Sequence, residues 1–186
     1  MKFTKTLISV VLIATCVFSH AGTVNEVVNG GFETGDFSGW NVSANATSVA
    51  KGSPYTEAGF YGARLGNVGG LGTISQTINT TGQATYTLSY WFSSDGALPN
   101  YFDVLWNGMQ VTGSEVSNAP AFGYTNYKFK VGGTGLDTLT FRERNDPAYQ
   151  GLDTISLINV PEPGSLALVG LGIVAVGLSR RRRRLK

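Results

Sequence analysis

The middle of the chain alternates apolar and polar residues with a period of two, the pattern of a β-strand with one buried and one outward face. Between residues 85 and 92 the apolar positions are Tyr86, Leu88, Tyr90 and Phe92. The same alternation predicts further strands at residues 73–78, 101–106, 109–112, 127–131, 138–142 and 152–158. Within residues 22–159 we find no helical period over ten residues or more. The sequence therefore predicts an all-β fold.

The spacing of these strands predicts how they pack. Turn residues separate them, among them Asn107-Gly108, a pair that favours a two-residue hairpin because both positions accept a positive φ. Many short strands with two-sided alternation are typical of two antiparallel sheets packed face to face. We therefore expect a single jelly-roll-like β-sandwich over residues 22–159, with Trp40 and Trp106 in its core.

The first 21 residues have the three parts of a secretory signal peptide. Basic Lys2 and Lys5 precede an apolar run over residues 7–18, and Ser19-His20-Ala21 offers small residues at a cleavage site. This predicts a signal peptide over residues 1–21 and cleavage after Ala21. An uncleaved anchor or a first core strand is the alternative, but 12 apolar residues are too few to span a bilayer. A lipidated Cys16 is a weaker alternative still, because Thr15 fits poorly before a lipidation site.

The last 27 residues, 160–186, form a second unit with its own order of parts. Val160, Pro161, Glu162 and Pro163 precede an uncharged run over residues 165–179, which predicts a short transmembrane helix of about 23 Å. Five arginines then follow and should stay on the cytoplasmic side; these membrane-stop residues are Arg180, Arg181, Arg182, Arg183 and Arg184. Everything before Val160 is then expected outside.

The charge distribution excludes several classes of function. Of the 14 basic residues, eight lie in the two end segments, so residues 22–160 carry six basic and eleven acidic residues, a balance of 6 − 11 = −5. Nucleic-acid binding needs clustered Lys and Arg, so we expect no nucleic-acid partner. Cys16 and His20 are the chain's only cysteine and histidine, and both lie in the leader. The exported body therefore has no disulfide framework, no Cys or His zinc site and no imidazole catalyst.

The tail motif Pro161-Glu162-Pro163, followed by the apolar run and the arginines, resembles the PEP-CTERM sorting signal of Gram-negative bacteria. The resemblance implies an exosortase as partner, an inner-membrane intermediate before processing, and a product at the cell surface or secreted. A plain tail anchor is the alternative.

The body is similar to carbohydrate-binding modules of the family 4, 9 and 22 group. The similarity rests on Asn29-Gly30-Gly31-Phe32-Glu33 near its start and on the segment Gly151–Leu157 near its end. This resemblance implies a structural calcium ion held by Glu33 and Asp153, whose oxygens suit Ca²⁺. Asp153 lies two and four residues before Ile155 and Leu157, so the alternation of a strand places all three on one face. This predicts that the Asp153 carboxylate points into the core. The alternative places Asp153 at the sheet rim, bonded to backbone or paired with Arg142 or Arg144.

Sugar-binding modules stack aromatic rings on pyranose rings. The candidates here are aromatic residues on an outward face or beside a loop: Trp91, Tyr101, Tyr124 and Tyr149, with Tyr55 and Tyr61 beside them. Ordinary core or surface packing is the alternative for each.

These patterns lead to one expected function and several alternatives. We expect an exported, exosortase-processed protein of the cell surface or extracellular matrix whose sandwich binds extracellular polysaccharide without catalysis. A secreted polysaccharide hydrolase using acids such as Glu115, Glu143 and Asp146, or a purely structural surface protein, is the alternative. The Thr-rich strands also suggest ice binding, although they show no regular ladder. The sequence names neither the glycan nor the oligomeric state.

Overall fold

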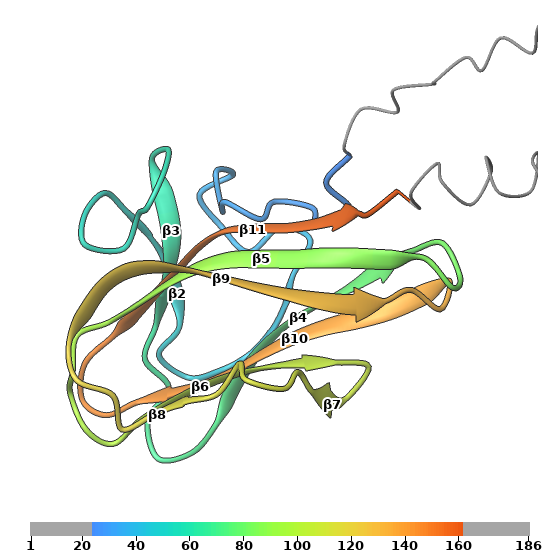
Figure 1. Cartoon of the computed structure of the whole chain (residues 1–186). Helices are drawn as coiled ribbons and strands as arrows, with labels where there is room; N and C mark the ends of the chain where they lie inside the picture. The colour runs from blue at the N-terminus through green and yellow to red at the C-terminus, as the bar shows by residue number, and fades with distance from the viewer. Residues whose placement is uncertain (1–23, 162–186) are drawn as a thin grey trace, which may run out of the picture.

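The computed structural model describes residues 24–161, which form eleven strands in two antiparallel sheets (Figure 1). One sheet has the order β1-β4-β10-β6-β7, with β8 also paired to β6. Its strands are β1 (Asn41–Ser43), β4 (Gly72–Asn79), β6 (Asn100–Trp106), β7 (Met109–Gln110), β8 (Val116–Ser117) and β10 (Leu136–Asn145). The other has the order β2-β3-β11-β5-β9. Its strands are β2 (Ser48–Lys51), β3 (Tyr61–Leu65), β5 (Thr85–Ser94), β9 (Phe122–Gly132) and β11 (Gln150–Asn159).

The two sheets enclose an aromatic core, which confirms the predicted sandwich. Tyr86, Leu88, Tyr90 and Phe92 of β5 are all buried, as their alternation predicts. Phe92 stacks on Phe102 of the facing sheet with ring centroids 4.0 Å apart. Both Trp40 and Trp106 are buried, as expected. The buried apolar residues of the described chain all lie within residues 27–157, so the sandwich contains the whole of this core.

The β6–β7 hairpin has the turn conformation predicted from its sequence. Asn107 and Gly108 have φ values of 52° and 78°, the positive values that this short turn needs. Strand β7 is shorter than predicted and ends at Gln110. The short strands β1, β2, β3 and β8 were not predicted, because none contains a long enough alternating run.

A bulge in β11 makes one expectation about Asp153 wrong. The pairing of β11 with β5 shifts register between Asp153 and Ser156, and Thr154 inside the bulge has φ of 51°. The extra residue reverses which face the following side chains occupy. Asp153 therefore pairs with outward Trp91, whereas Leu157 pairs with buried Leu88. Asp153 does not share the inward face of Ile155 and Leu157.

Several predictions concern residues beyond the described range. The signal peptide at residues 1–21, Glu162 and Pro163, the apolar run and Arg180–Arg184 all lie outside the described residues. The signal peptide and the transmembrane helix stay predictions. The boundaries proposed for the three units, 1–21, 22–159 and 160–186, stay predictions as well. Within residues 24–161 the structure contains no helix long and apolar enough to cross a membrane.

Candidate functional site

Gly151 is the centre of a cleft on the outer face of the five-stranded sheet. In the register of the sheet it lies between Arg64 of β3 and Ser93 of β5. A Cβ atom on Gly151 would lie 2.5 Å from Oη of Tyr124 and 2.6 Å from Oγ of Ser93. Such distances are far below ordinary contact, so only glycine allows the Tyr124 hydroxyl to extend over this strand. Tyr124 itself comes from the edge strand β9.

The loop between β2 and β3 supplies the opposite wall. It carries Tyr55, whose carbonyl oxygen would be 1.8 Å from a Cβ on Gly62, so the loop backbone lies directly on the sheet at this glycine. The rings of Tyr55 and Tyr149 meet edge to face with centroids 6.2 Å apart. The Arg64 guanidinium lies 4.3 Å from the centroid of the Tyr149 ring and 5.8 Å from that of Tyr55. These cation–π contacts hold both rings beside the sheet.

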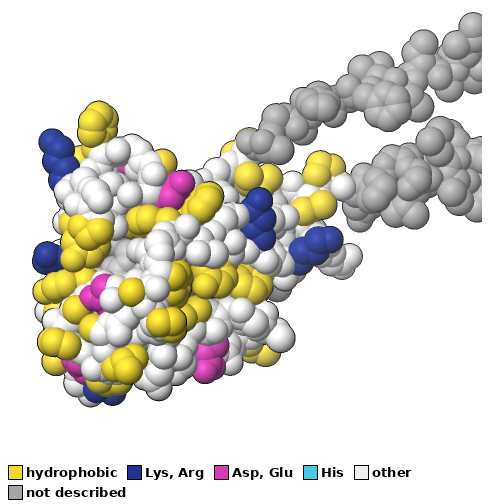
Figure 2. Space-filling model, turned by 60° about the vertical axis from the view of Figure 1, so that its left-hand side comes forward, with side chains coloured by type: hydrophobic (Ala, Val, Ile, Leu, Met, Phe, Trp, Pro, Cys, Tyr) yellow, Lys and Arg dark blue, Asp and Glu magenta, His cyan; other side chains and the backbone are white. Residues whose placement is uncertain are grey.

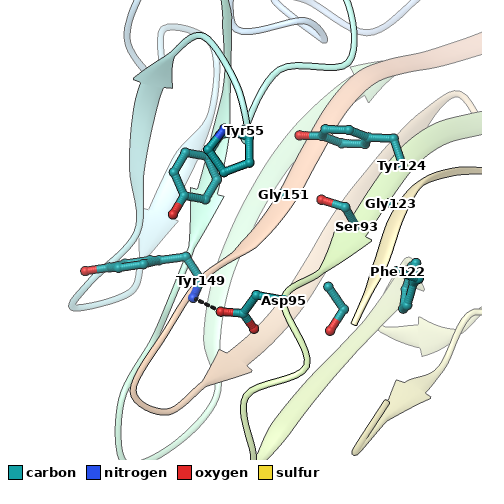
Figure 3. A pocket seen from close by; sticks show the side chains of 10 residues that line it. Tyr55, Ser93, Asp95, Phe122, Gly123, Tyr124, Tyr149 and Gly151 are labelled. Carbon is teal, nitrogen blue, oxygen red and sulfur yellow. Dashed lines mark hydrogen bonds between the residues drawn. The ribbon is translucent and has the colours of Figure 1, made fainter. Parts of the chain in front are cut away.

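The tyrosines enclose a cavity of about 170 Å³. Figure 3 shows Tyr55 and Tyr149 on one side of it and Tyr124 on the other, with Gly151 and Ser93 between them. The lining residues are Pro54, Tyr55, Ser93, Ser94, Asp95, Phe122, Gly123, Tyr124, Tyr149 and Gly151. We call this the tyrosine cleft. Aromatic walls and a polar floor are the combination by which proteins hold sugar rings.

Two polar groups of the tyrosine cleft have defined protonation states. Burial raises the pKa of Tyr124, with the charge of Asp153 acting in the same direction, so its hydroxyl is a neutral donor. This hydroxyl is buried and makes no hydrogen bond of ordinary geometry with the described residues, although the Ser93 hydroxyl beside it acts to lower its pKa. Burial also acts on Asp95, but hydrogen bonds from Asn145, Ala97 and Tyr149 outweigh it and lower the pKa of this carboxyl. The cleft therefore offers a neutral donor and an ionised acceptor.

The two carboxylates predicted to hold calcium anchor the loop that carries Tyr55. Asp153 Oδ2 accepts hydrogen bonds from the backbone N–H groups of Glu57, at 2.8 Å, and Ala58, at 3.1 Å. Glu33 Oε1 accepts from those of Phe60, at 3.0 Å, and Tyr61, at 3.1 Å. Burial raises the pKa of Asp153, and the N–H donors counteract it. We call this set of contacts the loop clamp.

The loop clamp bears on the calcium prediction. Its donors already point at oxygens of both carboxylates, so a cation there would compete with four amide N–H groups. Within residues 24–161 no three or more Asp, Glu, His or Cys side chains are grouped as a metal site. The residues thus match the backbone-bonded alternative for Asp153 better than a cation cage. Calcium binding stays a prediction.

The other predicted aromatic residues lie elsewhere. Tyr101 is on β6 of the opposite sheet, where its hydroxyl donates to Asp103 Oδ2 at 2.9 Å. Burial, aided by this bond, raises the pKa of Tyr101 to about 12. Trp91 is half-buried on the outer face of β5, one outward position along from Ser93. Tyr61 begins β3 and does not line the tyrosine cleft.

Three lining or neighbouring residues, Arg64, Ser93 and Asp95, were not among the predicted site residues. Ser93 could have been found from the sequence, because it lies two residues after Trp91 and the alternation of β5 places both side chains on the outward face. Arg64 gave no signal, since β3 itself was not predicted.

The acids considered for hydrolysis do not line the tyrosine cleft. Glu143 is fully buried and accepts a hydrogen bond from the Asn67 N–H at 2.9 Å. Asp146 pairs with Arg144 at 2.7 Å. Glu115 accepts from Gln110 at 3.1 Å. Asp153 pairs with neither Arg142 nor Arg144, because the described ion pairs of those arginines are with Asp103 and Asp146.

Comparison with known proteins adds two findings. Residues 159–184 match the PEP-CTERM protein-sorting motif, a match that includes Val160, Pro161, Glu162 and Pro163. No curated protein sequence matches the chain.

The described fold resembles solved carbohydrate-binding modules. TmCBM61, solved with β-1,4-galactotriose, aligns with a TM-score of 0.55 and 22% identity over 74% of this chain and 99% of that one. The CBM22-1 xylan-binding domain of Paenibacillus barcinonensis Xyn10C aligns with a TM-score of 0.51 and 14% identity, covering 72% and 94%. The K1 cleaved adhesin domain of Lys-gingipain from Porphyromonas gingivalis W83 gives 0.52 and 12%, covering 76% and 99%. The chain thus joins a PEP-CTERM sorting motif to a β-sandwich with the fold of carbohydrate-binding modules.

Proposed function

We propose that the sandwich binds extracellular polysaccharide in the tyrosine cleft and does not catalyse its cleavage. The observation that carries this proposal is the convergence of Tyr55, Tyr124 and Tyr149 around one cavity, with an unpartnered hydroxyl and an ionised carboxylate in its lining. The likeness to carbohydrate-binding modules supports it, although at this identity the likeness concerns the fold alone.

The route of the protein follows from the tail. We propose export by the N-terminal signal, an inner-membrane intermediate held by the C-terminal helix, and processing by an exosortase at the PEP-CTERM motif. The product then remains at the surface of a Gram-negative bacterium or in its extracellular matrix. Val160 and Pro161 support this order, because both are exposed directly after β11 and are accessible to an enzyme.

Binding of polysaccharides by a fragment of residues 22–161 tests the function, because that fragment contains the described core. We expect a set of extracellular polysaccharides to include at least one ligand. Tyr149→Ala should weaken its binding about tenfold, equivalent to roughly 1.4 kcal/mol. Tyr101→Ala, on the opposite sheet, is the matched control and should leave affinity unchanged. Equal affinity of wild type and Tyr149→Ala would contradict the cleft as binding site, and release of reducing sugars would favour the hydrolase.

A further inference from the structure

The basic residues of the described chain fall into two groups. Arg142 and Arg144 form the ion pairs found among residues 24–161, with Asp103 and Asp146. The remaining four basic residues, Lys51, Arg64, Lys128 and Lys130, have no carboxylate within ion-pair distance in the described structure. Three of these four lie on the outer face of the five-stranded sheet, the face that bears the tyrosine cleft.

The register of β5 with β9 arranges polar and aromatic side chains along this face. Trp91 pairs with Asn126, Ser89 with Lys128, and Thr87 with Lys130. Asn126 Nδ2 donates to Ser89 Oγ at 3.0 Å. Tyr124 precedes Asn126 on the same face, so the strip runs from the tyrosine cleft to Lys130. The six residue-to-residue steps from Tyr124 to Lys130 cover about 20 Å, which is the length of several sugar units in an extended chain.

Between Tyr124 and Lys130 neither the strip nor its register partners on β5 include an acidic side chain, and the ionised Asp95 of the tyrosine cleft follows the end of β5. Asp153, which pairs with Trp91 from the other side, is fully buried, and its carboxylate accepts N–H groups of the loop clamp. Lys128 and Lys130 are exposed. On the face turned to the viewer in Figure 2, basic side chains are spread over the surface and do not gather into one patch. Attraction here is therefore a matter of individual contacts and not of a broad positive field.

We propose that the ligand is an acidic polysaccharide that lies along this strip, a proposal that rests on the proposed function. One sugar unit occupies the tyrosine cleft, a second packs on Trp91, and carboxylate groups further along pair with Lys128 and Lys130. The domain is acidic overall, but charges are screened beyond about 8 Å at physiological salt, so the adjacent lysines act on the ligand more strongly than remote acids.

The test compares three polymers on the 22–161 fragment: polygalacturonate, the same polymer with its carboxyl groups reduced to alcohols, and polyglutamate. We expect polygalacturonate to bind at least tenfold more tightly than either control. The double variant Lys128→Gln/Lys130→Gln should lose about tenfold of that affinity. Lys51→Gln removes an equally unpaired charge away from the strip and should change nothing. Circular dichroism of each variant checks that its fold is intact.

Each other outcome separates the inference from the function beneath it. Equal binding of the reduced and acidic polymers would overturn the acidic specificity while leaving polysaccharide binding in place. Equal binding of polyglutamate would overturn it as well, since charge alone would then explain the attraction. Binding of neutral polysaccharides only would refute the inference, and failure of every polysaccharide would refute the proposed function. An equal loss with Lys51→Gln would refute the placement of the ligand along β9.

Discussion

Replacing Gly151 by alanine tests the geometry of the tyrosine cleft directly. The added Cβ would lie 2.5 Å from Oη of Tyr124, 3.0 Å from its Cζ and 2.6 Å from Oγ of Ser93. Ordinary contact requires about 3.5 Å, so the Tyr124 hydroxyl must retreat by about 1 Å and Ser93 must rotate. Because Tyr124 lines the cavity, this displacement changes the shape of the cleft. Gly151→Ala should therefore lower both stability and affinity.

The size of the effect follows from the two contacts. Overpacking of this kind costs about 1–3 kcal/mol, and about 1 kcal/mol lowers the melting temperature of a domain of this size by roughly 4 °C. Tyr124→Phe alone should cost little, because it removes a buried hydroxyl with no partner among the described residues. A protein that already carries Tyr124→Phe lacks the Oη atom that makes the shortest contact with the added Cβ. In that protein Gly151→Ala should therefore cost about 1–2 kcal/mol less of folding free energy.

Thermal unfolding of the wild type, both single variants and the double variant measures this coupling. We expect the double variant to melt about 4–8 °C above the sum of the single effects. The affinity for polysaccharide supplies a second readout, since Gly151→Ala should weaken binding about tenfold even where the fold is intact. Additive melting temperatures, or an alanine variant as stable as the wild type, would show that Tyr124 does not lie over Gly151 in solution.

Three further predictions concern Glu143, Asp137 and Glu33. Burial raises the pKa of Glu143 above its ordinary value of 4.5, so the unfolded chain releases this proton at a lower pH than the folded protein does. Stability should fall as the pH rises above 4.5, and a melting series should show a shallower fall for Glu143→Gln. Burial acts to raise the pKa of Asp137, but hydrogen bonds from Asn107, Thr134 and Thr80 outweigh it and lower this pKa to about 2. The stability that the ionised carboxylate provides should disappear as the pH falls from about 4 to about 2. A melting series of Asp137→Asn should lack this acid-sensitive step. If Glu33 helps hold calcium, as the sequence resemblance implies, the ion at a hundred times its dissociation constant should add about 2.7 kcal/mol, and Glu33→Gln should abolish the gain; an unchanged midpoint would remove the calcium prediction.

The sequence predicted the long strands and the core because their residues repeat one simple relation between position and face. In β5 each buried residue is followed by an outward one, and this pattern survives any register with its neighbours. The Asn107-Gly108 hairpin was equally predictable, because a local preference fixes it. The short strand β3 was not, because its sequence around Arg64 contains glycine and alanine in place of an alternating run.

The site was predicted only in its residue types. Tyr124 and Tyr149 were named together with Tyr101, yet strand order places Tyr101 on the other sheet. That order depends on pairings between segments far apart in the chain, which a local pattern does not encode. The bulge at Thr154 is a similar case, since one residue in a left-handed conformation reversed the expected direction of Asp153.

The loop clamp explains how residues outside the cleft can govern it. Glu33 belongs to the segment before β1 and Asp153 to β11, yet both bind backbone N–H groups of the loop that carries Tyr55. Backbone donors are matched by position and not by residue type, so the loop sequence can vary while the clamp persists. The ring of Tyr55 is thus placed by carboxylates that need not touch the ligand. Glu33 and Asp153 can therefore fix how the cleft is held, while the proposed ligand would contact other residues, such as Tyr149.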